Sequence, residues 1–203
     1  MVDQLQLIRI EVDEKSLNDA KALLFNVRYG IEDALRISAN KTAATGKSRV
    51  SRRVQDVVNL PINKEIRPRI KVIKARYGNT TSFVLISRKP IQLIKYPYLV
   101  APLIGVSVEM QRSKRQIFRH AFKATMPTGH TGLFERRYYT GGIPVRRLPI
   151  GQGPVTGKTA RSEMVGPSIG LIFDRNGGDQ VTEDLSDVFA KNLTNEVNRL
   201  LSK

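Results

Sequence analysis

Two stretches of the sequence resemble the phosphate-binding loop of nucleotide hydrolases, in which the spacing Gly-x-x-x-x-Gly-Lys-Ser/Thr turns successive backbone amides toward the phosphates. One stretch ends in Gly157-Lys158-Thr159, but Gln152 stands where the first glycine is needed. The other ends in Gly46-Lys47-Ser48, with Lys41 at that position. Thr159 and Asp174 are also too close in the chain to hold the helix and crossover that precede a magnesium-binding aspartate. The sequence therefore argues against nucleotide hydrolysis.

A third stretch, Gly166-Pro167-Ser168-Ile169-Gly170, has the spacing of the nucleophile elbow of α/β-hydrolases. That elbow needs a strand before the serine and a helix after it, and the sequence pattern predicts neither. The acid and the histidine of the triad should also follow the serine, whereas His120 and His130 both precede it. We therefore interpret Ser168 as a loop serine. A hydrolase or nucleotidase remains only as a third hypothesis, which rests on these incomplete motifs.

The two histidines lack the companions that a metal site or a general base requires. The chain has no cysteine and no His-Glu-x-x-His spacing, so no thiolate site, disulfide framework or cysteine nucleophile can form. We expect His120 to lie on a strand face and His130 to shape a turn. The sequence thus predicts a protein that is not an enzyme, with no catalytic residue, no metal and no cofactor.

The positive charge of the chain is concentrated in its middle. Residues 41–147 contain 23 Lys or Arg against four Asp or Glu, while the segments on either side are slightly acidic. Such a field attracts polyanions, and a basic surface that serves solubility alone needs far less charge. No base-reading motif is present, so any contact with nucleic acid should be directed at the backbone. Candidate contacts to DNA or to acidic neighbouring subunits are Arg49, Arg52, Arg53, Arg112, Lys114, Arg115, Arg136, Arg137, Arg146 and Arg147.

The elements that would carry these residues can be read from hydrophobic periodicity. Residues 4–13 alternate as a strand does, and from Ser16 to Ile37 the apolar residues recur at intervals of three and four, which predicts a long amphipathic helix. A second, basic helix is expected from Gly46 to near Pro61, with its arginines opposite its valines. A short apolar run at Phe83–Ile86 predicts a buried strand.

Further along, residues 104–111 and 117–124 alternate and predict a hairpin with a basic tip at Arg112-Ser113-Lys114-Arg115. A third strand is expected at 133–139, then a long Gly/Pro-rich loop over 141–167, then a helix from about Glu183 with Thr182 as its N-cap. This order predicts one α+β domain over 1–203, mainly an antiparallel sheet packed with the N-terminal and C-terminal helices. We expect no secretory signal and no membrane-spanning segment.

From Phe122 onward the order of landmark residues becomes specific. The landmarks are Phe122-Lys123-Ala124-Thr125-Met126, Gly129-His130-Thr131-Gly132-Leu133-Phe134-Glu135-Arg136, Arg147-Leu148-Pro149-Ile150 and Gly166-Pro167-Ser168-Ile169. With these landmarks the sequence resembles the minor tail protein Z family of tailed bacteriophages and prophages, and the resemblance covers most of the chain. Family members run from Leu-Pro-Ile to Gly-Pro-Ser in a few residues. Here residues 151–165 intervene, so we expect a loop insertion there, whose role the resemblance does not supply.

The resemblance implies a structural virion protein that completes the tail at its head-proximal end, in the neck. It implies a homo-oligomer, a ring of six around the DNA channel, with the tail terminator, tail tube and head-tail connector as partners and genomic DNA in the channel. The protein would be assembled in the host cytoplasm and reside in the virion. The alternative is a free-standing, sequence-nonspecific nucleic-acid-binding protein, which needs the same basic middle but no ring.

Overall fold

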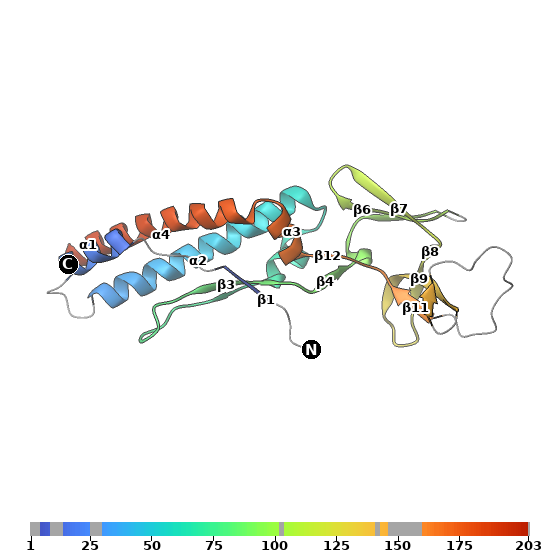
Figure 1. Ribbon diagram of the computed structural model, residues 1–203, viewed down its shortest axis with the longest axis horizontal. Coiled ribbons are helices and arrows are strands. Elements are labelled where there is room, and N and C mark those ends of the chain that lie inside the picture. The colour runs from blue at the N-terminus through green and yellow to red at the C-terminus, as the bar shows by residue number, and fades with distance from the viewer. Residues whose placement is uncertain are drawn as a thin grey trace. The chain divides into compact units, whose positions relative to one another are not determined.

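The computed structural model describes residues 5–8, 14–24, 30–101, 104–140, 143–145 and 160–202 (Figure 1). The chain divides into two compact units. The first, called here the helical unit, comprises residues 1–57, 61–89 and 168–203, and the second, the β unit, comprises residues 58–60 and 90–167. Helices and antiparallel strands confirm the α+β class. The division into two units does not test whether residues 1–203 form a single domain, which stays a prediction.

The N-terminal helical region differs from the prediction in its boundaries. One helix, α1 (Glu14–Leu23), ends early, and the next, α2 (Gly30–Val57), runs without interruption through the glycine that was expected to separate two helices. A Cβ on Gly46 would lie 3.1 Å from the Leu185 side chain and 3.3 Å from that of Val84. Gly46 therefore allows α2 to approach its neighbours closely and does not break the helix.

Two further helices complete the helical unit, α3 (Ile169–Arg175) and α4 (Gly178–Leu201). The predicted C-terminal helix is confirmed but begins earlier than expected. Gly177 caps it in the left-handed region, with φ 86°, while the Thr182 hydroxyl donates to the Gly178 carbonyl from within the helix. The two long helices, α2 and α4, lie side by side (Figure 1). The residues of α2 that face α4 are small and buried. Their shared core contains Ala34, Ala39, Phe189, Leu193 and Val197, together with Ala20 of α1 and Leu24 directly after it.

A three-stranded antiparallel sheet covers α2 on another side, in the order β1 (Leu5–Ile8), β3 (Phe83–Ser87), β2 (Ile70–Ile73). The register aligns Leu7, Leu85 and Lys71 across the three strands. The inward residues Ile70, Val84 and Ile86 are fully buried. β3 confirms its prediction, and β1 confirms the first part of the strand predicted at 4–13, of which residues 9–13 lie outside the described residues. The sequence did not predict β2, which follows a π-helical turn at Ile62–Ile66 and a 3₁₀ turn at Arg67–Arg69.

Within the described residues, the strands of the β unit form three small sheets. The predicted hairpin is confirmed as β6 (Gly105–Gln111) and β7 (Lys114–Arg119), with β5 (Tyr98–Ala101) on its other side. The predicted strand at 117–124 is broken at His120, whose φ of 67° turns the chain out of that sheet. The expectation that His120 lies on a strand face is therefore wrong.

After the break the chain forms β8 (Ala121–Thr125), which pairs with β9 (Thr131–Thr140), the strand predicted at 133–139. The loop predicted over 141–167 is wrong in part, because residues near both of its ends pair as strands. That stretch contains β10 (Ile143–Val145) and β11 (Ala160–Glu163), which both pair with β9. It ends with β12 (Val165–Ser168), which pairs with β4 (Pro90–Gln92). A 3₁₀ turn at Leu93–Lys95 follows β4. Residues 146–159, and with them most of the expected insertion, lie outside the described residues.

Candidate basic interface

The three candidate arginines of α2 have different surroundings. The Arg49 guanidinium pairs with the Asp184 carboxylate at 3.1 Å, and Arg53 Nε donates to the Asn176 carbonyl oxygen at 2.6 Å. Arg49 therefore binds a residue of α4, and Arg53 binds the residue that directly follows α3. Arg52 is exposed, and none of the described residues forms an ion pair or hydrogen bond with it. Of the three, Arg52 is the one available to a partner.

At the β6–β7 hairpin, Glu109 organises the turn. Its carboxylate accepts hydrogen bonds from the Asn59 side chain at 3.0 Å and the Ser113 backbone at 3.1 Å, and it pairs with Arg115 at 3.4 Å. The turn itself is only two residues, Arg112 and Ser113, with Ser113 at φ 62°, so the tip is narrower than predicted. Arg112 and Lys114 are exposed and have no acidic partner in the described part of the chain.

Two of the remaining candidates lie in β9. Arg136 and Arg137 belong to that strand, and their side chains lie outside the description. Arg146 and Arg147 lie outside the described residues. The structure therefore brings Arg112, Lys114 and Arg115 together on one hairpin, and Arg49, Arg52 and Arg53 on one helix.

The charge balance of the β unit singles out the hairpin. Its sequence has 12 Lys or Arg and only three acidic residues. Glu109 is bound as described, the Glu163 carboxylate oxygen lies 2.9 Å from the His130 ring nitrogen, and Glu135 has a partner as well. Sequence reasoning missed the exposed cations Arg119, Lys123 and Arg161. The strand alternation that located β7 and β8 already placed the first two in a sheet and could have identified them.

The landmark residues of the β unit lie at the β8–β9 turn and pack closely against one another. The β8–β9 turn closes with hydrogen bonds from the Met126 amide to the His130 carbonyl at 2.7 Å and from the Gly129 amide to the Met126 carbonyl at 2.9 Å. The His130 ring meets the edge of Phe134, which is buried against Phe122. A Cβ on Gly132 would lie 2.7 Å from the Glu163 carboxylate. These residues build the sheet and leave little space between its side chains.

The motifs that resemble active sites have structural explanations where the structure describes them. A strand, β12, does precede Ser168 and a helix, α3, does follow it, so the expectation that neither is present was wrong. However, Ser168 has an unstrained extended backbone, is 7% exposed, and its hydroxyl accepts a hydrogen bond from the Leu171 amide at 3.2 Å. It therefore acts as the N-cap of α3. Gly46-Lys47-Ser48 lies inside α2, and Gly151–Thr159 lies outside the described residues.

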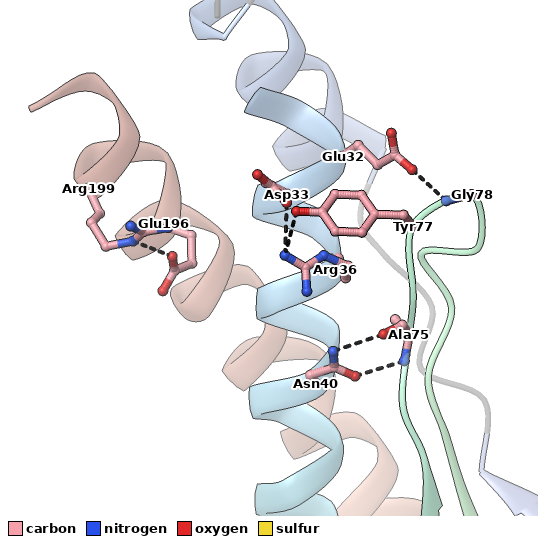
Figure 2. A network of polar contacts seen from close by, with 9 residues as sticks. All are labelled: Glu32, Asp33, Arg36, Asn40, Ala75, Tyr77, Gly78, Glu196 and Arg199. Atoms are coloured by element: carbon pink, nitrogen blue, oxygen red, sulfur yellow. Dashed lines mark hydrogen bonds and ion pairs between the residues drawn. The ribbon is translucent and has the colours of Figure 1, made fainter. Parts of the chain in front are cut away.

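A polar network that the sequence did not reveal holds the turn after β2 against α2 (Figure 2). The Asn40 side chain pairs with both backbone groups of Ala75, accepting from its amide at 2.8 Å and donating to its carbonyl at 3.2 Å. The Arg36 guanidinium lies over the Tyr77 ring, 4.3 Å from its centre. The Gly78 amide donates to the Glu32 carboxylate at 2.7 Å. Three positions of the turn region, Ala75, Tyr77 and Gly78, are thus tied to one helix.

Two carboxyl groups near this network have shifted pKa values. The hydrogen bond from Arg36 lowers the pKa of Asp33 below its ordinary value. Burial alone would raise the pKa of Glu196, but hydrogen bonds from Lys41 and Arg199 outweigh it, and the pKa of Glu196 lies below its ordinary value. Glu196 therefore stays ionised in the interface between α2 and α4. Both shifts have structural causes and neither points to proton transfer.

Within the described residues, no three His, Asp or Glu side chains gather as metal ligands, and no helix is both long and apolar enough to cross a membrane. In the β unit a hollow of about 280 Å³ opens beside His120, lined among others by Arg119, Glu135 and Met164. Its polar walls and open mouth do not resemble an enclosed small-molecule site. Comparison of the chain with protein-family models, with curated proteins and with solved structures gave no match.

Proposed function

We propose that this chain is a structural, non-catalytic subunit that completes the tail of a tailed bacteriophage at its head-proximal end, as a ring around the DNA channel. The observation that carries the proposal is the β6–β7 hairpin, where Arg112 and Lys114 are exposed and without acidic partners in the described structure. Of the three acidic residues of the same unit, Glu109 binds Asn59, Ser113 and Arg115, and both Glu163 and Glu135 have partners of their own. The landmark residues that resemble the minor tail protein Z family support the same assignment.

Exposed cations without acidic partners, placed on a two-residue turn, can bind the phosphates of a polyanion. Arginine and lysine contacts to phosphate gain affinity from counterion release and carry no base specificity. A channel protein must hold DNA without reading its sequence, and in a ring the same hairpin would be repeated once in every subunit. An acidic wall of a neighbouring tail or neck protein is the other polyanionic surface that these cations fit.

The proposal is tested by light scattering and negative-stain imaging of the purified chain, combined with binding to double-stranded DNA of random sequence. We expect discrete rings, and we expect Arg112→Glu/Lys114→Glu to weaken DNA binding at least tenfold. The matched control is Lys21→Glu/Lys191→Glu, which reverses two exposed lysines on the helices of the other unit.

The outcomes separate the hypotheses. Rings whose DNA affinity falls only with the hairpin variant support the tail-completion subunit. A stable monomer that binds DNA and releases it steeply with salt favours the free-standing nucleic-acid-binding protein. A measured hydrolytic activity that Ser168→Ala abolishes would overturn the non-catalytic assignment.

A further inference from the structure

We propose that copies of this chain join head to tail by continuing the β1–β3–β2 sheet from one subunit into the next, with the open edge of β2 pairing with the open edge of β1 in a second copy. This inference rests on the proposed function, because it names the contact from which a ring would be built. It uses residues of the helical unit only.

The first observation is that this sheet has two open edges. β3 is the central strand, and within the described residues no strand pairs with the outer edge of β1 or of β2. An exposed edge offers a row of unpaired amides and carbonyls, which bind another strand readily unless side chains prevent it. Both edge strands are four residues long, so each can pair fully with the other.

The second observation is a hollow of about 580 Å³ beside the end of β2 and the turn that follows it. Val72, Ile73, Lys74, Arg76 and Asn79 line it, and Ile73 is 49% exposed there. On the same outer face of the sheet, Phe83 and Leu85 are only partly buried. An added strand would cover this apolar surface and extend it across the subunit boundary.

The third observation is that the receiving edge is held in place. The contacts of Asn40 with Ala75, of Arg36 with Tyr77 and of Glu32 with Gly78 fasten the segment directly after β2 to α2 (Figure 2). An edge fixed in this way loses little conformational freedom when a partner strand binds, which favours association.

Charge decides which strand fits. Lys71 on β2, and Lys74 and Arg76 directly after it, are exposed, and none of the described residues gives them an acidic partner. Two β2 edges would therefore repel each other. The β1 strand, Leu5–Ile8, is uncharged and lies in an acidic stretch of sequence. Residues 1–14 contain Asp3, Glu11, Asp13 and Glu14 and a single cation, Arg9.

A contact between two different edges is heterologous. Each subunit then uses one edge to bind the previous copy and the other edge to bind the next one, and the series closes into a ring if the rotation between subunits allows it. Within one copy β3 separates β1 from β2, which places them about 9–10 Å apart. That separation exceeds the reach of a disulfide.

The absence of native cysteine makes disulfide cross-linking a direct test. The full chain would carry Leu7→Cys with Lys71→Cys, and in a second variant Leu5→Cys with Ile73→Cys, so that more than one register is sampled. We expect mild oxidation to give a ladder of covalent oligomers in at least one double variant, and monomers in each single variant. Dimers from Lys71→Cys alone, or assembled protein with no ladder in either pair, would overturn the proposal.

Charge reversal supplies an independent test that does not depend on register. One variant carries Lys71→Glu/Lys74→Glu/Arg76→Glu, and the other carries Asp3→Lys/Glu11→Lys/Asp13→Lys. We expect each alone to self-associate at least tenfold more weakly, and an equimolar mixture to recover assembly as an alternating oligomer. The control, Lys21→Glu/Arg175→Glu/Lys191→Glu, makes the same change in net charge as the first variant, at exposed residues away from the edge, and should assemble normally.

Circular dichroism and thermal unfolding of every variant ensure that lost assembly is not lost folding. If the edge variants assemble like the parent chain, sheet continuation is wrong while the hairpin and its DNA binding are untouched. If the parent chain is monomeric at every concentration, both the ring and this contact fail.

Discussion

Ser168 closes the N-terminal end of α3, and its hydroxyl satisfies the Leu171 amide at 3.2 Å. Replacing an N-cap serine by alanine leaves that amide without its acceptor and costs about 1 kcal/mol. We therefore expect Ser168→Ala to lower the free energy of unfolding by about that amount in urea denaturation. Ser48→Ala is the control, since its exposed hydroxyl bonds only the Ala44 carbonyl within α2 and its loss should change stability little. Equal stability of the Ser168 variant and the parent would exclude the cap.

Glu196 gives a pH-dependent contribution to stability. Its side chain is 3% exposed and binds Lys41 and Arg199, and its pKa lies below the ordinary 4.5. A carboxyl group whose folded pKa is depressed contributes stability above its unfolded pKa, and loses it as pH falls through the folded pKa. We expect unfolding free energy to decline below about pH 4.5, and Glu196→Gln to reduce that slope while costing about 1–3 kcal/mol at neutral pH. Urea titrations at several pH values measure both effects. An unchanged acid slope in the variant would contradict the assignment.

The binding partners of individual side chains were the part of the candidate interface that the sequence predicted least well. Periodicity placed Arg49, Arg52 and Arg53 on one helix, but all three read alike as exposed cations. Arg49 and Arg53 bind Asp184 and Asn176, more than 100 residues away in the chain, and only tertiary structure reveals such partners. The hairpin cations could be identified because a hairpin and its tip are local features.

At the scale of the elements, a prediction concerns Gly46, where α2 packs against both α4 and the sheet. Leu185 and Val84, which a Cβ there would meet at 3.1 and 3.3 Å, are both buried and have little room to move. We expect Gly46→Val to destabilise the chain by about 1–3 kcal/mol in urea denaturation, because overpacking forces the helix and its neighbours apart. In Gly46→Ala a gain in helix propensity of about 1 kcal/mol should offset most of the smaller clash.

Ala44→Val is the matched control for Gly46→Val, because Ala44 is exposed two residues earlier in the same helix. It should cost less than 1 kcal/mol. A destabilisation as large as that of Gly46→Val would mean that helix propensity, and not close packing, explains the glycine.

The same packing explains why sequence reasoning divided the elements incorrectly. Glycine lowers helix propensity, so Gly46 was interpreted as a boundary between two helices. The close approach that requires it here involves Leu185 and Val84, which are far away in the chain. β2 was missed because Ile70–Ile73 alternates with lysine in a short basic segment and becomes a strand through its pairing with β3. By contrast β6, β7 and β9 were found, since a long alternating run predicts a strand from local sequence alone.

For the molecule as a whole, the net charge of +16 raises the question of whether DNA binding would be spread over the surface or concentrated at the hairpin. Each phosphate contact that is lost should reduce the slope of log affinity against log salt concentration by about 0.9. If Arg112 and Lys114 contact phosphates, Arg112→Ala/Lys114→Ala should reduce that slope by about 1.8 per bound subunit. Lys21→Ala/Lys191→Ala removes the same charge from the helical unit and should leave the slope nearly unchanged. Fluorescence anisotropy with a random duplex over a salt series makes the comparison. Equal reductions in the two variants would mean that binding follows overall charge, and the hairpin would lose its special role.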